Sequence, residues 1–227
     1  MCIRDRYIIS NYNFNNNLHV IHNGVDESYF NDDKLTNKDK MINKYNLHGC
    51  FIVSSIGRFT ELKDFETFIE GIELANKTNP DIRGIISGYV SMDKRDYYNK
   101  IKKLIKDKNL EKIIYIILDI PDVRLIYSIS NVIVSCSKKP ESFGLTLIES
   151  LFMNTPVIST KHGGPIDIIL ENKNGYFIEP NNASQLASLI SNPNKFAFND
   201  LRKNAISKYT SLEMFKNYQD IYLETKN

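Results

Sequence analysis

The sequence lacks the features of several common functional classes. Its three cysteines are odd in number, stand far apart and form no paired-cysteine motif, which excludes a disulfide framework and a cysteine zinc site. The net charge is only +2, whereas a nucleic-acid partner needs a concentrated basic face. No apolar run approaches the roughly 18–20 residues that a membrane span requires. We therefore expect a globular domain with reduced thiols, which fits the cytoplasm, and no nucleic-acid partner.

A recognisable metal site is also missing. His19, His22 and His48 have no acidic or cysteine partners at ligand spacing. There is no Asp-x-Asp pair of the kind that holds a divalent ion on a nucleotide. We expect neither a metal nor a cofactor.

One lysine-rich stretch could suggest an anionic partner. Between residues 97 and 109 the lysines alternate with Ile101, Leu104 and Ile105 at helical spacing. This pattern favours a solvated helix face over a patch for anionic membranes.

From residue 49 onward the chain alternates short apolar runs with amphipathic stretches. Six runs predict strands, at 51–56, 82–87, 113–118, 132–136, 156–159 and 176–178. Helices are expected from residue 65 and over 94–108, 121–129, 145–153, 184–190, 196–209 and 212–224. Such alternation predicts an α/β fold, a Rossmann-like doubly wound parallel sheet, which binds ligands beyond the carboxyl ends of its strands.

We divide the chain into four segments. Residues 1–17 are a non-native or residual segment, because their first six residues fit neither a helix nor a strand and resemble a translated sequencing adapter. Residues 18–48 form a linker region, with a short strand at 20–21 ending in a turn at 23–24. Residues 49–210 form the Rossmann-like domain, and 211–227 a C-terminal helix. We expect the true N-terminus to be missing.

The most informative motif runs from Glu141 to Glu149, where two glutamates bracket a glycine turn that opens a helix. The N-terminus of a helix offers unpaired N–H groups and a positive dipole end, which together suit a phosphate. A carboxylate on each side can hold sugar hydroxyls. Glu171 and Glu179 have the same spacing, but they enclose a turn into a strand, so we interpret that pair as a coincidence.

Two further loops are expected at the same edge of the sheet. The loop 57–63 carries Arg58 and Lys63 after Gly57, and these cations suit a diphosphate. The loop 160–165 carries Gly163 and Gly164, which allow close approach of a ligand to the backbone. The role of His162 in that loop stays open.

Taken in order, these motifs resemble the donor-binding half of retaining glycosyltransferases of family 4, which have two facing Rossmann-like domains (GT-B). The segment 20–26 with Phe30 is similar to the interdomain linker of that family, although His22 stands where proline is usual. The resemblance covers residues 18–224.

The resemblance implies a role for each matching residue. Arg58 and Lys63 neutralise the departing diphosphate, and Glu141 lies beside the transferred sugar. Glu149 binds the ribose hydroxyls. The remaining donor-binding residues are Gly57, Ser142, Phe143, Gly144, Leu145 and Thr146, with the backbone amides of residues 143–145 facing the phosphates.

Three departures from the family pattern matter. Ser142 replaces a usual glycine, which would restrict the turn. Tyr89 and Val90 replace a usual Asp-Gly, and Leu118 replaces a glycine. The last two leave the nucleotide base open.

The implied reaction transfers a sugar from a nucleoside-diphosphate-sugar to an acceptor hydroxyl with retention of configuration. A missing N-terminal domain is expected to bind the glycan or lipid-linked acceptor and to make any peripheral contact with the inner membrane. By analogy, the product belongs to bacterial polysaccharide biosynthesis. Alternative interpretations are a non-catalytic nucleotide-sugar-binding fragment, a nucleotide-sugar epimerase of the same architecture, and a regulatory or protein-interaction domain.

Overall fold

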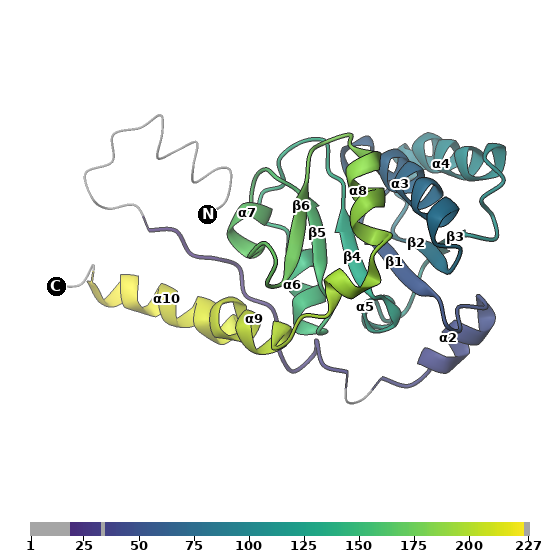
Figure 1. Ribbon diagram of the computed structural model, residues 1–227. Coiled ribbons are helices and arrows are strands. Elements are labelled where there is room, and N and C mark those ends of the chain that lie inside the picture. Colours follow the sequence, from purple (N-terminus) through teal and green to yellow (C-terminus); the bar gives the residue numbers. More distant parts are fainter. Residues whose placement is uncertain (1–18, 33–34, 225–227) are drawn as a thin grey trace.

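A six-stranded parallel sheet forms the centre of the computed structural model, which describes residues 19–32 and 35–224 (Figure 1). Its order is β3-β2-β1-β4-β5-β6. The strands are β1 (Phe51–Ile56), β2 (Ile82–Gly88), β3 (Ile114–Leu118), β4 (Val132–Ser135), β5 (Val157–Thr160) and β6 (Gly175–Ile178). All six expected strands are confirmed within one or two residues. The order reverses between β1 and β4, so the topological switch point lies beyond their carboxyl ends.

Helices cover both faces of this sheet, as the Rossmann-like prediction requires. On one face lie α3 (Phe65–Thr78), α4 (Arg95–Asp107) and α8 (Ala183–Ile190). On the other lie α2 (Lys38–Lys44), α5 (Arg124–Ile129), α6 (Leu145–Phe152), α7 (Pro165–Ile168) and α9 (Leu201–Tyr209). Successive strand residues face opposite ways, so Ile52 and Val53 are both buried but in different clusters.

Two sequence predictions need correction. The expected strand at 20–21 does not form; in the described part of the linker, the β-bridge lies instead at Val25, which pairs with Thr210 outside the sheet. The single helix expected over 196–209 is instead a 3-10 turn (Pro193–Phe196), a bend and then α9. Asp200 stands at that bend with φ 58°, a left-handed conformation that a continuous helix does not contain.

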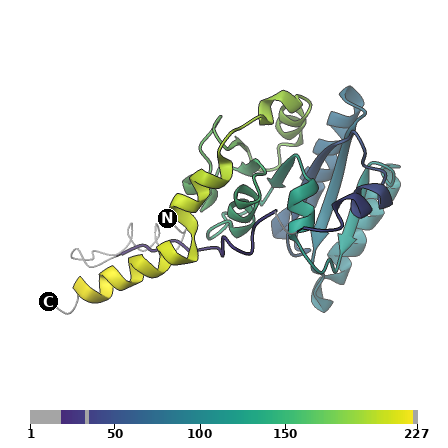
Figure 2. The same ribbon diagram turned by 90° about the horizontal axis from the view of Figure 1, so that it is seen from below.

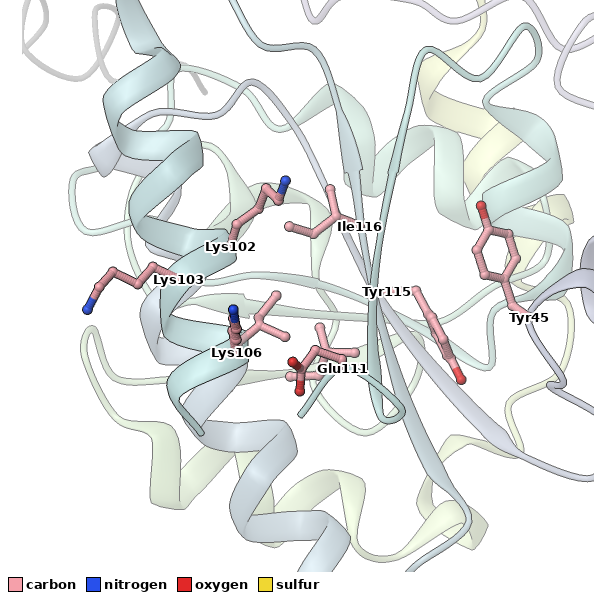
Figure 3. A pocket seen from close by; sticks show the side chains of 9 residues that line it. Tyr45, Lys102, Lys103, Lys106, Glu111, Tyr115 and Ile116 are labelled. Carbon is pink, nitrogen blue, oxygen red and sulfur yellow. The ribbon is translucent and has the colours of Figure 1, made fainter. Parts of the chain in front are cut away.

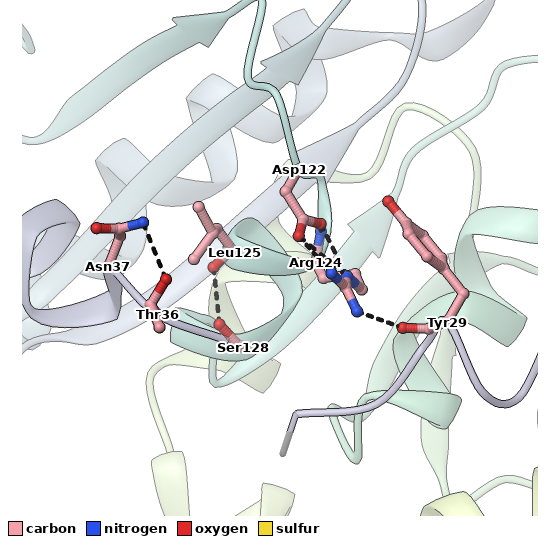
Figure 4. Close-up of polar contacts among 7 residues, drawn as sticks. All are labelled: Tyr29, Thr36, Asn37, Asp122, Arg124, Leu125 and Ser128. Carbon is pink, nitrogen blue, oxygen red and sulfur yellow. Dashed lines mark hydrogen bonds and ion pairs between the residues drawn. The ribbon is translucent and has the colours of Figure 1, made fainter. Parts of the chain in front are cut away.

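The linker is pinned to the domain by two arginines. Arg124 lies over the ring of Tyr29 at 4.2 Å and donates a hydrogen bond to its carbonyl oxygen (Figure 4). Asp122 holds the Arg124 guanidinium through both carboxylate oxygens, and this pairing lowers the pKa of Asp122. Arg202 donates to the carbonyl oxygens of Glu27 and Phe30. The linker thus has a defined path across α5 and α9.

The final helix, α10 (Ser211–Glu224), projects away from the sheet (Figure 2). None of its residues is buried, and the linker meets its first turns where Gly24 N–H donates to Met214 Sδ. Across the described residues, no helix has the length and apolar character to cross a membrane.

Candidate functional site

The turn from Glu141 leads into α6, as the sequence predicts. Gly144 adopts φ 103° as the residue before the helix, a conformation that glycine reaches without strain. No side chain caps this end, and in the described part of the chain the N–H groups of Phe143, Gly144 and Leu145 have no acceptor. Ser142 avoids the left-handed region, so its side chain does not restrict the turn. The turn therefore presents consecutive amides at a positive helix end.

Lys63 and Glu141, which are 78 positions apart, meet at this edge. The Lys63 ammonium lies 2.5 Å from Glu141 Oε1, and the two side chains are only 19% and 11% exposed. Gly57 makes room for the lysine, because a Cβ there would lie 2.9 Å from Lys63 Cε. The sequence predicted both residues at one site but not their direct pairing.

Two serines at the end of β4 complete the surroundings of Glu141. Ser137 donates to Glu141 Oε1, and Ser135 donates to the same oxygen at 3.2 Å. Burial alone would raise the pKa of Glu141, but the Lys63 charge and the donated hydrogen bonds outweigh it and lower the pKa. Glu141 is thus held as a carboxylate. Neither serine was singled out from the sequence, where only their position at a strand end could have drawn attention.

Arg58 differs from Lys63 in its surroundings. It lies exposed on the loop after β1 and forms no hydrogen bond or ion pair within the residues that the structure describes. Its guanidinium is available to an anion at the edge where α6 begins.

Glu149 stands one turn into α6 and is half-buried. Its Oε2 accepts a hydrogen bond of 2.5 Å from Tyr127, a fully buried residue of α5. Burial raises the pKa of Glu149, and the tyrosine hydrogen bond opposes that rise. Nothing in the sequence singles out Tyr127, because its position in the pattern fits an ordinary core residue.

The paired glycines support the turn rather than lying open beside it. Gly164 N–H donates to the Glu141 carbonyl oxygen at 2.9 Å, and Gly163 bridges to Glu141. A Cβ on Gly164 would lie 2.2 Å from the carbonyl oxygen of Phe143. The sequence predicted that a ligand would approach the backbone of these glycines closely. In the structure, the turn at residues 141–143 occupies that place.

His162 precedes these glycines in the same loop. Both of its ring nitrogens are buried and have no hydrogen-bond partner within the described residues.

We expect Gly164→Ala to destabilise the fold by about 1–3 kcal/mol, because the added methyl group overlaps the Phe143 backbone. Thermal unfolding measures the change. Gly49→Ala is the comparison, since nothing lies within 4 Å of a Cβ there and only its backbone conformation at φ 72° resists the change. The prediction is wrong if Gly164→Ala unfolds at the wild-type temperature.

Two hollows lie apart from this turn. One of about 270 Å³ opens beyond the carboxyl ends of β2 and β3, and its lining includes Val90, Tyr98 and Leu118. Another, of about 430 Å³, lies between α4 and the edge strand β3, with Lys102 and Lys106 on the helix side and Ile116 on the strand side (Figure 3). Neither hollow is lined by any of the site residues that we predicted from the sequence.

Comparison with known proteins identifies the family. The sequence profile of the glycosyl transferases group 1 family matches residues 37–207, which is most of the chain. The chain belongs to this family.

Individual relatives agree with this assignment. The poly(ribitol-phosphate) alpha-N-acetylglucosaminyltransferase of Staphylococcus aureus (strain COL) is 28% identical over 236 residues, covering 96% of this chain and 46% of its own length. The crystal structure of a glycosyltransferase from Rickettsia africae ESF-5 has a TM-score of 0.87 and 29% identity, covering 97% of this chain and 61% of its own. The chain spans about half the length of the curated relatives it matches.

A second similar structure includes ligands. S. aureus TarM, crystallised with fondaparinux, alpha-GlcNAc-glycerol and UDP, has a TM-score of 0.76 and 26% identity, covering 96% of this chain and 42% of its own. Within the described residues of this group 1 chain, no cluster of histidine, cysteine and acidic side chains suits a metal ion.

Proposed function

We propose that this chain is the donor-binding half of a retaining glycosyltransferase of family 4. The observation that carries the proposal is the meeting of the Lys63–Glu141 pair with the amides of residues 143–145 at the switch point of the sheet. Cation, carboxylate and open N–H groups are the groups that a nucleoside-diphosphate-sugar requires. The UDP bound by a similar structure of the same family supports this assignment.

The donor is proposed to lie across the edge of the sheet. Its diphosphate lies between Arg58, Lys63 and the start of α6, and Glu149 accepts hydrogen bonds from the ribose. The lysine ammonium has three donors, so it can hold Glu141 and a phosphate oxygen together. The hollow beyond β2 and β3 then receives the base, with Leu118 and Val90 as its wall.

Catalysis in this proposal acts on the leaving group. As the glycosidic bond breaks, negative charge grows on the diphosphate and the sugar becomes oxocarbenium-like. Arg58, Lys63 and the helix N-terminus bind the developing charge more strongly than the ground state. Glu141 orients the donor sugar and provides a fixed negative charge beside it.

The remaining partners are also proposals. A preceding domain, which the longer relatives have room for, is assigned the glycan or lipid-linked acceptor and any peripheral membrane contact. We assign the reaction to the cytoplasm and require no metal for it.

Thermal unfolding of this chain with UDP-, GDP- and ADP-sugars tests the donor site. A ligand at about 100 times its dissociation constant stabilises the folded protein by about 2.7 kcal/mol. For a domain of this size, that raises the unfolding temperature by roughly 5–10 °C. We expect such a shift with one nucleotide class and its loss in Arg58→Ala. A cooperative transition that no nucleotide-sugar moves would contradict the proposal.

A further inference from the structure

Tyr127 lies beneath the proposed ribose-binding carboxylate. Its side chain is fully buried, and its hydroxyl donates to Glu149 Oε2 at 2.5 Å. The two residues belong to different helices, α5 and α6, and lie 22 positions apart. The contact is therefore a tertiary interaction and not a consequence of local helix geometry.

The tyrosine is fixed in place from several sides. Thr155 Oγ1 donates to the Tyr127 carbonyl oxygen at 2.9 Å, which holds the end of α5. The Phe30 ring from the linker meets the phenol edge-on, with ring centroids 6.2 Å apart. A buried phenol held in this way presents its hydroxyl in one direction, so it can fix the rotamer of the carboxylate that it contacts.

We propose that Tyr127 is a positioning residue of the donor site, which holds Glu149 so that its second oxygen, Oε1, accepts from the ribose hydroxyls. This inference rests on the proposed function. Within the described residues Oε1 has no partner, and the side chain is only half-buried. One oxygen is thus taken by the protein, and one is left for a ligand.

Two opposing effects act on the pKa of Glu149. Burial raises the pKa of Glu149 and favours the neutral acid, whereas the hydrogen bond from Tyr127 lowers it. Burial also holds the pKa of Tyr127 well above its usual value, so the phenol stays a neutral donor. In its ionised form the Glu149 carboxylate is an acceptor only, which matches a pair of ribose hydroxyls.

A second buried pair in the same chain shows what a purely structural contact looks like. Tyr97 of α4 donates to Glu66 Oε2 at 2.6 Å, but there Lys100 occupies Oε1 at 2.8 Å. The Tyr97 hydroxyl also accepts from the Phe65 N–H. Both carboxylate oxygens of Glu66 thus have partners within the protein. This pair lies on the face of the sheet opposite Tyr127. Among the residues that the structure describes, no such cation pairs with Glu149.

The test compares Tyr127→Phe with Tyr97→Phe, which remove the same hydroxyl at the two pairs. Calorimetric titration measures binding of UDP and of 2′,3′-dideoxy-UDP to the 227-residue chain. We expect Tyr127→Phe to weaken the binding of UDP by roughly tenfold or more, as for the loss of a hydrogen bond to a charged group. The affinity for the dideoxy compound should stay unchanged. Tyr97→Phe should leave both affinities unchanged.

The outcomes separate this inference from the proposed function. If Tyr127→Phe weakens the binding of both nucleotides equally, the role of Tyr127 is structural and the positioning inference is overturned. Unchanged UDP affinity in Tyr127→Phe overturns it as well, while the donor site stands. If the unaltered chain binds neither UDP nor GDP nor ADP, the proposed function fails and this inference with it.

Discussion

In an active form of the enzyme, Arg58→Ala and Lys63→Ala are each expected to lower turnover by about 10²–10³-fold, or about 2.7–4 kcal/mol in barrier height. Each removes a cation from the position where, in the proposed mechanism, charge develops on the leaving diphosphate. A continuous assay of released nucleoside diphosphate measures the effect.

The two variants should differ in stability. Arg58 is exposed and without a partner in the described residues, so its loss costs little. Lys63→Ala leaves the 11% exposed Glu141 carboxylate without its cation, so this variant should unfold at a lower temperature while staying folded in the assay. Lys77→Ala is the control, because Lys77 is a 64% exposed cation on α3 far from the turn. Wild-type turnover in both site variants would refute the phosphate assignment.

Glu141→Gln should keep nucleotide affinity and lose transfer by about 10²–10³-fold. The glutamine preserves the shape of the side chain, and Lys63 remains available to phosphate once its carboxylate partner is neutral. What is lost is the fixed negative charge beside the oxocarbenium-like sugar. Binding of UDP and the rate of sugar transfer are measured on the same preparation.

The matched control for this variant is Glu171→Gln. Glu171 belongs to the other glutamate pair with the same spacing and is exposed beside the turn into β6. A Glu141→Gln enzyme that transfers sugar at the wild-type rate would show that the carboxylate has no part in the reaction. Equal losses in both variants would show that the effect is not specific to the site.

The fold was largely predictable because its signals are local. Each strand is a short apolar run, and each crossover helix has its own amphipathic period, so the alternation alone predicts a parallel sheet. The exceptions are informative. Apolar residues at 20–21 resemble a strand, but they form no β-bridge with the described residues, and the bridge of this segment lies at Val25. The expected helix over 196–209 is broken at Asp200, whose left-handed backbone interrupts an apparently continuous pattern.

The site was predictable as a set of loops but not as a set of contacts. The turn before α6 follows from Gly144 and the helix that it opens, and the switch point places Arg58 and Lys63 near it. The Lys63–Glu141 pair and the Tyr127–Glu149 hydrogen bond depend on how distant elements pack, so no local spacing encodes them. Gly164 shows the same limit, because the group it approaches is the backbone of Phe143.

The most direct test of the central claim is to locate the bound donor by amide NMR of the isotopically labelled chain during titration with UDP-sugar. The account predicts that the amide resonances of Gly57, Phe143, Gly144 and Leu145 shift with ligand concentration, since these backbone groups surround the proposed diphosphate. Shifts confined to the hollow between α4 and β3, around Lys102 and Lys106, with none at the turn before α6, would contradict it and move the binding site away from that turn.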